Sequence, residues 1–311
     1  MQGKNHFSII GTGAVGGYYG GLLHRAGFDV HFLLNQDFDY VREYGLRIDS
    51  INGNFNLPNI QTYNDPKKMP KCDVVIVALK TTANTALPDI LPHLIKDDSV
   101  VLTLQNGMGS DDKIATLIGA ENVLGGLCFL CSNKVGSGHI RHLDYGLITI
   151  GEYRSNGEPG GITPRLEKIG GDFMAAGIPM KLVKDLALAR WKKLVWNIPF
   201  NGLSVTRNVL TDELVKDPST RALCETLMNE VACASAACSR PIEPAFIQKM
   251  LVDTERMKPY ATSMKLDYNR GNPMELEAIY EVPIHTAEGN DVIMPETKKL
   301  YQQLCAMNPL L

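Results

Sequence analysis

The sequence has no long apolar run, no excess of basic charge and no biased composition. No stretch of about 18 consecutive apolar residues occurs, so there is no candidate membrane-spanning helix. The 31 basic and 34 acidic side chains give a net charge of -3 without any block of like charges, which argues against a nucleic-acid-binding surface. Hydrophobic residues at 44% and charged residues at 21% are close to globular averages. We expect a folded protein with neither a nucleic-acid nor a membrane partner.

The first residues also lack the pattern of a secretory signal peptide. Residues 1–6 do not combine a basic start with an apolar run, and strand-like sequence begins at Phe7. Seven cysteines, an odd number spread over a long chain, fit reduced thiols better than a disulfide framework. Cys128 and Cys131 form a lone CxxC, which we interpret as thiols of a strand rather than a metal or redox pair. A cytoplasmic protein without a metal site is the expectation.

The length of 311 residues favours two domains, and the pattern changes part-way along the chain. Strand-like and helix-like segments alternate in the first half, as in doubly wound α/β folds. The expected buried strands are residues 7–10, 30–34, 74–79, 100–104 and 123–130. Residues 139–151 alternate in polarity and predict antiparallel edge strands. The helices expected after Lys184 are near residues 185–206, 218–238, 243–255, 273–288 and 295–306. We therefore predict an α/β domain over residues 1–184 and an all-α domain over residues 185–311.

A glycine-rich turn follows the first strand-like run. Residues 11–16 form a GxGxxG pattern with a strand before it and a helix-like segment after it. The first glycine permits a tight turn, the second lets backbone approach a pyrophosphate, and the third lets helix and strand pack closely. The first domain is thus expected to be a Rossmann-type, doubly wound dinucleotide-binding domain. The cofactor-binding residues expected in the turn are Gly11, Thr12, Gly13, Ala14, Val15 and Gly16.

The residue at the end of the second strand distinguishes NAD from NADP in such domains. A carboxylate there binds the ribose 2′-hydroxyl, whereas a nearby base accommodates a 2′-phosphate. Asn35 occupies this position, and the missing carboxylate favours NADP(H), with NAD(H) as the open alternative. Arg42 is the nearest cation, and it is either a phosphate ligand or a solvated helix residue.

Three polar residues recur along an otherwise apolar segment of the second domain. Lys193, Asn197 and Asn201 are four residues apart, which places them on one face of a helix. They either form an exposed edge or line a polar cleft, because burying them unpaired costs about 1–3 kcal/mol each. The second interpretation fits the reduction of a ketone, in which a partly desolvated lysine protonates the oxygen that gains negative charge.

Together these motifs resemble the ketopantoate reductase (2-dehydropantoate 2-reductase) family over nearly the whole chain. The marks of the resemblance are the glycine turn, Lys80 in VALK, Asn106 in LQNG, the segment WKKLVWNIPFN, and Thr262-Ser263-Met264 followed by Asp267 and Glu275. The resemblance implies an NADPH-binding Rossmann domain and a helical domain. It also implies reduction of ketopantoate to pantoate on the route to pantothenate and coenzyme A.

The resemblance implies a role for each marked residue. Lys193 resembles the general acid and Glu275 the essential acidic residue; without the family, Glu275 is a first-turn acid of a helix that begins after Pro273. Lys80 is expected beside the cofactor, and Asn106 where nicotinamide and substrate meet. The expected substrate-binding residues are Asn106, Asn197, Asn201 and Ser263.

Asn35 departs from the family, which usually has an arginine at this position to bind the 2′-phosphate. The function predicted is NADPH-dependent reduction of ketopantoate with Lys193 as general acid. Two alternatives stay open: an NAD(P)-dependent dehydrogenase of another small 2-oxo or hydroxy acid, and a dinucleotide-sensing protein without turnover. The expected partner is a small 2-oxo acid, and a homodimer of the chain is left open.

Overall fold

The computed structural model describes residues 4–308 and divides them into two compact units. The sheet unit comprises residues 4–105 and 110–186, and the helical unit comprises residues 106–109 and 187–308. The short segment 106–109 follows the sheet strand that ends at Thr103, yet it packs with the helices. One loop of the first half of the chain is therefore part of the helical unit.

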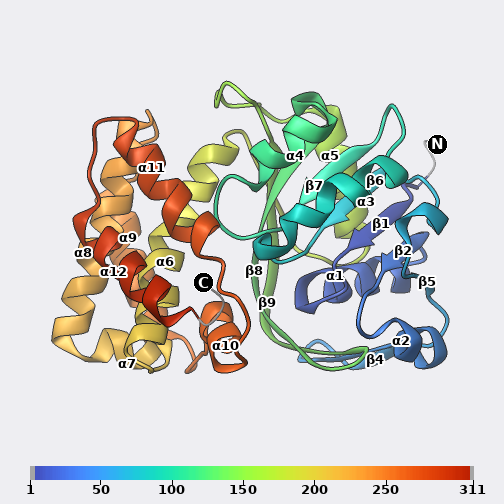
Figure 1. Ribbon diagram of the computed structural model, residues 1–311, viewed down its shortest axis with the longest axis horizontal. Helices are drawn as coiled ribbons and strands as arrows, with labels where there is room; N and C mark the ends of the chain where they lie inside the picture. Colours follow the sequence, from blue (N-terminus) through green and yellow to red (C-terminus); the bar gives the residue numbers. More distant parts are fainter. Residues whose placement is uncertain (1–3, 309–311) are drawn as a thin grey trace. The chain divides into compact units, whose positions relative to one another are not determined.

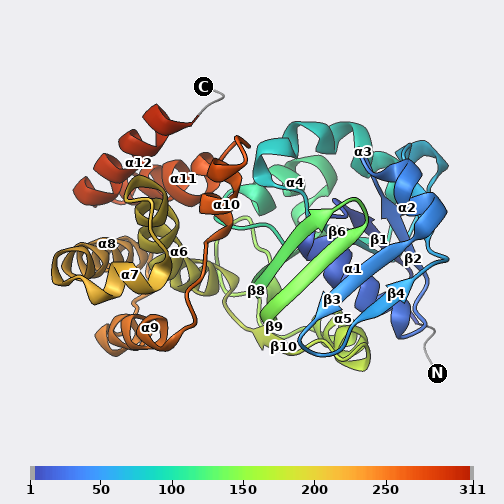
Figure 2. The same cartoon turned by 90° about the horizontal axis from the view of Figure 1, so that it is seen from below.

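The sheet unit is built on a mainly parallel sheet (Figures 1 and 2). Its strands are β1 (Phe7–Ile10), β2 (Val30–Leu33), β3 (Leu46–Ser50), β4 (Phe55–Leu57), β5 (Gln61–Tyr63), β6 (Val74–Val77), β7 (Val100–Thr103), β8 (Val123–Gly136), β9 (His139–Glu152) and β10 (Met180–Val183). Within the described residues the order is β4-β3-β9-β8-β7-β6-β1-β2-β5, with β10 also beside β9. Among the strand pairs of residues 4–308, only β8–β9 and β3–β4 are antiparallel.

Helices cover both faces of this sheet, as the near-continuous apolar strands predict. The helices of the unit are α1 (Ala14–Arg25), α2 (Phe38–Tyr44), η1 (Pro66–Lys68), η2 (Thr81–Ala86), α3 (Leu87–Leu94), α4 (Ser110–Ile118), η3 (Ala120–Asn122) and α5 (Pro164–Ala175). Ile76 of β6 packs in one apolar cluster with residues of α1 and α5, whereas its neighbours Val75 and Val77 pack with α3 and α4. The predicted Rossmann-type, doubly wound fold is confirmed.

The predicted position of residues 139–151 at a sheet edge is wrong. Strand β9 pairs antiparallel with β8, as expected, but its other side is covered by β3 along one half and by β10 along the other. Both covering strands come from segments that are far away in the sequence, so the alternating pattern shows the antiparallel pairing without showing these neighbours. The long β8–β9 hairpin and the strands beside it are visible in Figure 2.

The helical unit contains the predicted helices and two short ones that were not predicted. Its elements are α6 (Leu186–Thr206), α7 (Thr211–Lys216), α8 (Pro218–Ala237), α9 (Pro244–Arg256), α10 (Ser263–Asn269), η4 (Glu277–Glu281), α11 (Val282–Glu288) and α12 (Pro295–Met307). One apolar cluster joins α6 to the later helices, with Trp191, Leu227 and Tyr280 among its buried members. The helix expected over 273–288 starts only near Leu276, and its first part is a π-helix.

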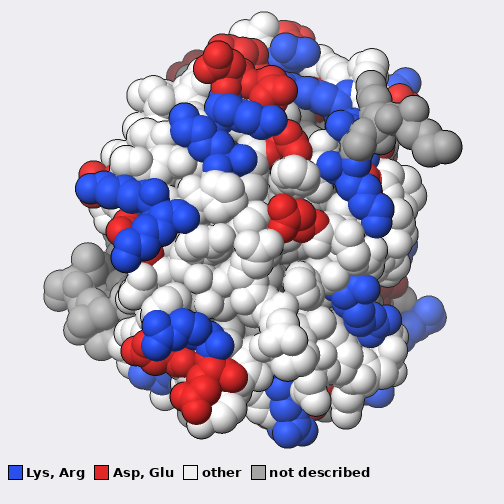
Figure 3. Space-filling model, turned by 90° about the vertical axis from the view of Figure 1, so that its right-hand side faces the viewer, with Lys and Arg blue, Asp and Glu red and all other residues white. Residues whose placement is uncertain are grey.

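Charged side chains on the face drawn in Figure 3 do not gather by sign. Basic and acidic groups lie next to one another there, with uncharged surface between these groups. The sheet unit also contains ion pairs of Arg42 with Asp39 and of Lys96 with Asp73.

Candidate functional site

The glycine turn lies between β1 and α1, and two of its glycines are required by the packing. Gly11 has φ +93°, and a Cβ added there would lie 2.6 Å from the backbone nitrogen of Leu79. A Cβ on Gly16 would lie 2.3 Å from the carbonyl oxygen of Gly11. The first and third glycines of the pattern therefore let the turn, the neighbouring strand and the helix approach closely.

Gly13 is different, because nothing lies within 4 Å of the place where its Cβ would be. It is the N-cap of α1, no side chain caps the helix there, and the first turn contains no acidic residue. The start of this helix thus offers backbone N–H groups and the positive end of the helix dipole to an anion. The open second glycine beside a bare helix N-terminus fits a dinucleotide pyrophosphate.

The neighbouring strand ends carry the other residues expected to bind the cofactor. Lys80 follows β6, is exposed and precedes η2, while Asn35 follows β2 and is also exposed. Arg42 on α2 is 63% exposed, forms an ion pair with Asp39 and lies over the ring of Phe38. These contacts favour the interpretation of Arg42 as a solvated helix residue.

A cation that the sequence did not indicate lies at the same end of the sheet. Lys134, near the end of β8, places its Nζ 2.6 Å from Asp37 Oδ2 and 3.5 Å from the carbonyl oxygen of Thr12. The Thr12 hydroxyl in turn donates a hydrogen bond to the carbonyl of Leu33 at 3.0 Å. Lys134 is 122 positions away from Thr12 in sequence, so only the course of the β8–β9 hairpin brings it there.

In the helical unit, the polar stripe of α6 is not an exposed edge. Asn197 and Asn201 are only 5% and 3% exposed, and Lys193 is half-buried. Their neighbours on the helix belong to the apolar cluster of this unit. The interpretation as a solvated edge is wrong for the two amides, because both are buried. Amide side chains this buried must have polar partners or a ligand.

The loop 106–109 is fixed to this helix and to η4 by contacts at three successive residues. Lys193 Nζ donates to Asn106 Oδ1 at 2.6 Å, and Arg190 Nη1 donates to the carbonyl of Gly107 at 3.0 Å. The N–H of Met108 donates to the carbonyl of Ala278 at 2.8 Å. Arg190 and Lys193 are three residues apart and therefore neighbours on α6.

The loop and η4 also fit each other sterically. Gly107 has φ +82°, and a Cβ there would lie 2.3 Å from the carbonyl oxygen of Ala278. Ala278 belongs to the π-helix, whose wider turn leaves a carbonyl for a donor outside the helix. The π-helix, which the sequence did not indicate, thus provides the acceptor for the loop that carries Asn106.

Ser263 is the first residue of α10, and a buried polar cluster holds this helix start. Thr262 caps the helix by accepting from the N–H of Lys265, and its hydroxyl lies 2.9 Å from that of Ser204 on α6. Lys265 Nζ donates to the carbonyl of Ser204 and to Asn208 Oδ1 at 2.7 Å. Burial lowers the pKa of Lys265, and the charge of Glu213 opposes this effect. The cluster joins α10 to the end of α6.

Glu275 is buried, with 4% of its surface exposed, and it precedes the helix instead of lying in its first turn. Its carbonyl accepts the N–H of Ile279. The interpretation of Glu275 as a first-turn acid of a helix that begins after Pro273 is therefore wrong, because the helix begins one residue after Glu275. Of the expected site residues, Lys193 and Asn106 are in direct contact. Arg190 and Lys134 are the two functional candidates that the sequence did not reveal.

Within residues 4–308, none of the helices has the length and apolar character needed to cross a membrane.

The family model for ketopantoate reductase PanE/ApbA matches residues 7–155, and the model for its C-terminal part matches residues 185–308. A 2-dehydropantoate 2-reductase of Nostoc sp. is 54% identical over 301 residues, which cover 97% of this chain and 94% of the relative. The chain belongs to the ketopantoate reductase family.

Solved structures agree with this assignment. A crystal structure of 2-dehydropantoate 2-reductase from Geobacter metallireducens superposes with a TM-score of 0.93 at 37% identity, covering 97% of this chain and 99% of that one. D-mandelate dehydrogenase in complex with NADH and anilino(oxo)acetate has a TM-score of 0.88 at 20% identity over 97% of this chain and 98% of that one, which shows a shared fold. The predicted class, an oxidoreductase of the ketopantoate reductase type, is confirmed, and a nicotinamide dinucleotide is its class of cofactor.

Proposed function

We propose that this protein reduces ketopantoate (2-dehydropantoate) to pantoate in pantothenate and coenzyme A biosynthesis, with NADPH as reductant and Lys193 as general acid. The observation that carries the proposal is the hydrogen bond of 2.6 Å from Lys193 Nζ to Asn106 Oδ1. It joins the lysine of the α6 stripe to the loop that follows a central strand of the sheet. Membership of the ketopantoate reductase family supports the substrate.

A bound nicotinamide supplies the hydride that reduces the carbonyl carbon. Negative charge develops on the carbonyl oxygen, and the Lys193 ammonium donates a proton to it. Asn106 holds this ammonium through its amide oxygen, so the proton donor is fixed before the substrate binds. An ammonium is also the group that attracts the anionic 2-oxo acid.

The other polar residues of the helical unit are assigned to the substrate. Asn197 and Asn201 are buried amides with N–H donors, and Ser263 offers a hydroxyl at the start of α10. They bind the carboxylate and hydroxyl groups of the oxo acid. Glu275, a buried carboxylate, is the acidic residue of this set. Its carboxylate accepts a hydrogen bond from the substrate's hydroxyl and so fixes that group.

The cofactor is assigned to the glycine turn and the strand ends. Residues 11–16 bind the pyrophosphate, Lys80 and Asn35 contact the adenosine half, and Asn106 contacts the nicotinamide. In this proposal residues 1–184 form the cofactor domain and residues 185–311 the substrate domain. A cytoplasmic location and assembly as a homodimer remain predictions, and light scattering of the purified protein tests the second.

The test is oxidation of NADPH by the purified protein with and without ketopantoate, followed by a panel of other small 2-oxo acids. We expect turnover with ketopantoate that exceeds turnover with the rest of the panel. Oxidation of NADPH no faster with ketopantoate than without it overturns the substrate assignment. Turnover of another oxo acid alone indicates a dehydrogenase of different specificity, and binding of NADPH without any turnover indicates a sensor.

A further inference from the structure

None of the residues directly after β2, from position 34 to 37, is a cation. Asn35 is uncharged, and Arg42 lies further along the chain, on α2, where its exposed side chain pairs with Asp39 and lies over the ring of Phe38. A 2′-phosphate carries up to two negative charges at the ribose next to this strand end, and dinucleotide-binding domains meet it with a cation there. A second element of the sheet unit supplies such a cation.

We propose that Lys134 is the residue that selects a 2′-phosphorylated dinucleotide. Its ammonium contacts Asp37, four residues after the end of β2, and lies 3.5 Å from the carbonyl oxygen of Thr12 in the glycine turn. These two positions flank the ribose site of a dinucleotide-binding domain. Both contacts lie within the sheet unit. The inference rests on the proposed use of a dinucleotide.

Asp37 positions this lysine and is not a ribose ligand. It is only 7% exposed, and its Oδ2 accepts both the Lys134 ammonium and the N–H of Gly138 in the turn between β8 and β9. The carboxylate therefore binds two groups of the β8–β9 hairpin and links this hairpin to the start of α2. An acid that bound the ribose 2′-hydroxyl, as in NAD-dependent domains, would need its oxygens directed to the ligand.

Lys134 keeps the properties that a phosphate ligand needs. Its side chain is 33% exposed and is therefore partly accessible to solvent and to a ligand. An ammonium has three donor hydrogens, and a phosphate oxygen forms a charge-assisted hydrogen bond with one of them. The neighbouring exposed amides of Asn35 and Gln36 add neutral donors at the same strand end.

The experiment compares equilibrium binding of NADPH and NADH to the full-length protein and its variants by titration calorimetry, without substrate. Lys134→Met keeps the length of the side chain and removes the charge. We expect NADPH affinity to fall about ten- to a hundredfold while NADH affinity changes less than about twofold. Lys134→Arg keeps the charge and should retain the preference for NADPH. Arg42→Ala, the matched control at the neighbouring cation, should leave both affinities within about twofold.

Each result decides the matter. Retained NADH binding shows that the Lys134→Met protein is folded, and 2′,5′-ADP against 5′-ADP repeats the comparison with fragments that lack the nicotinamide. Equal losses for NADPH and NADH, unchanged affinity for both, or a preference that disappears in Arg42→Ala instead overturn the assignment. A wild-type protein that prefers NADH overturns it too. Wild-type protein that binds NADPH selectively but does not reduce ketopantoate contradicts only the proposed function.

Discussion

The two ends of the central strands of the sheet are built differently. At their carboxyl ends, β1, β6 and β7 lead into the glycine turn, Lys80 and the loop with Asn106, where backbone and side chains are accessible to ligands. At their amino ends, the same strands are joined by side chains that bind one another. The strands thus provide the proposed ligand-binding groups at one end and their own stabilisation at the other.

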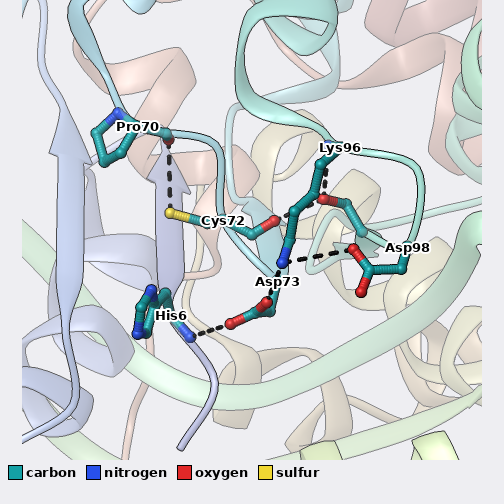
Figure 4. Close-up of polar contacts among 7 residues, drawn as sticks. His6, Pro70, Cys72, Asp73, Lys96 and Asp98 are labelled. Atoms are coloured by element: carbon teal, nitrogen blue, oxygen red, sulfur yellow. Dashed lines mark hydrogen bonds and ion pairs between the residues drawn. The ribbon is translucent and has the colours of Figure 1, made fainter.

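Figure 4 shows the contacts at the amino ends. Asp73, just before β6, accepts the N–H of His6 at 2.8 Å and the ammonium of Lys96 at 2.6 Å. Ser99 donates to the carbonyl of Cys72 at 2.6 Å, and burial raises the pKa of the Cys72 thiol to about 11. A thiol with so high a pKa stays protonated at neutral pH and is a poor nucleophile. This end therefore holds the starts of the strands together and carries no sign of chemistry.

The largest expected effect is at Lys193, the proposed proton donor, which contacts Asn106. Lys193→Ala should lower kcat by about 10²- to 10⁴-fold, since the alkoxide then lacks its general acid. Cofactor affinity should be nearly unchanged in a binding titration. The matched control is Lys192→Ala, because the ammonium of Lys192 lies over the ring of Phe246, whereas that of Lys193 contacts Asn106. Equal loss in both variants would contradict the assignment of Lys193.

Arg190 should have the next largest effect, because it holds the peptide that follows Asn106. Arg190→Ala should lower kcat about ten- to a hundredfold through misplacement of Asn106 and Lys193, with little change in KM for NADPH. Arg190→Lys, which keeps a donor for the Gly107 carbonyl, should recover part of the loss. Steady-state kinetics and thermal melts of each variant distinguish this loss of activity from a loss of folded protein. A stable variant with unaltered kcat would show that the loop needs no such support.

Within the six residues of the glycine turn, we expect Gly13 to serve ligand binding and Gly16 to serve packing. Gly13→Ala should weaken NADPH binding about tenfold or more with little change in Tm, because its added methyl group enters open space where the pyrophosphate is expected. Gly16→Ala should instead cost about 1–3 kcal/mol of stability, since the methyl group meets the carbonyl of Gly11. Gly171→Ala, in open space on α5, is the control. NADPH titrations and thermal melts of all three variants test this division of roles. Normal NADPH binding by Gly13→Ala would refute it.

The smallest effect on activity is expected at the amino ends. Asp73→Asn should leave kcat unchanged and lower stability by about 1 kcal/mol, since the partly exposed carboxylate loses its charged hydrogen bond with Lys96. Burial acts to raise the pKa of Asp73, but the Lys96 ammonium and the His6 N–H outweigh it and lower the pKa below its usual value.

A pH series tests the same carboxylate. Because the pKa of Asp73 is lower in the folded protein, its stabilisation is complete above the unfolded pKa and is lost as pH falls through the folded one. Urea unfolding at decreasing pH should therefore bring wild type and Asp73→Asn closer together. A constant difference between them down to the lowest pH would show that the charge of Asp73 does not contribute.

The main elements could be predicted from the sequence because each has a local cause. Apolar runs between glycines predict buried parallel strands, and the GxGxxG pattern predicts the turn that Gly11 and Gly16 form. The short strands β3, β4, β5 and β10 were not predicted, because they mix polar and apolar residues and lack the continuous apolar run of equally short strands such as β6 and β7. The same limit applies to the position of β9, whose neighbours are set by pairing partners elsewhere in the chain.

The sequence by itself determined the two kinds of domain, the glycine turn and the spacing that places Lys193, Asn197 and Asn201 on one helix face. These follow from interactions between residues a few positions apart. Only the tertiary structure decided that Asn106 receives the Lys193 ammonium, that Arg190 and a π-helix hold the loop, and that Lys134 reaches the glycine turn. Such contacts join residues about 80 to 170 positions apart, so they depend on how strands and helices pack and leave no pattern in the sequence.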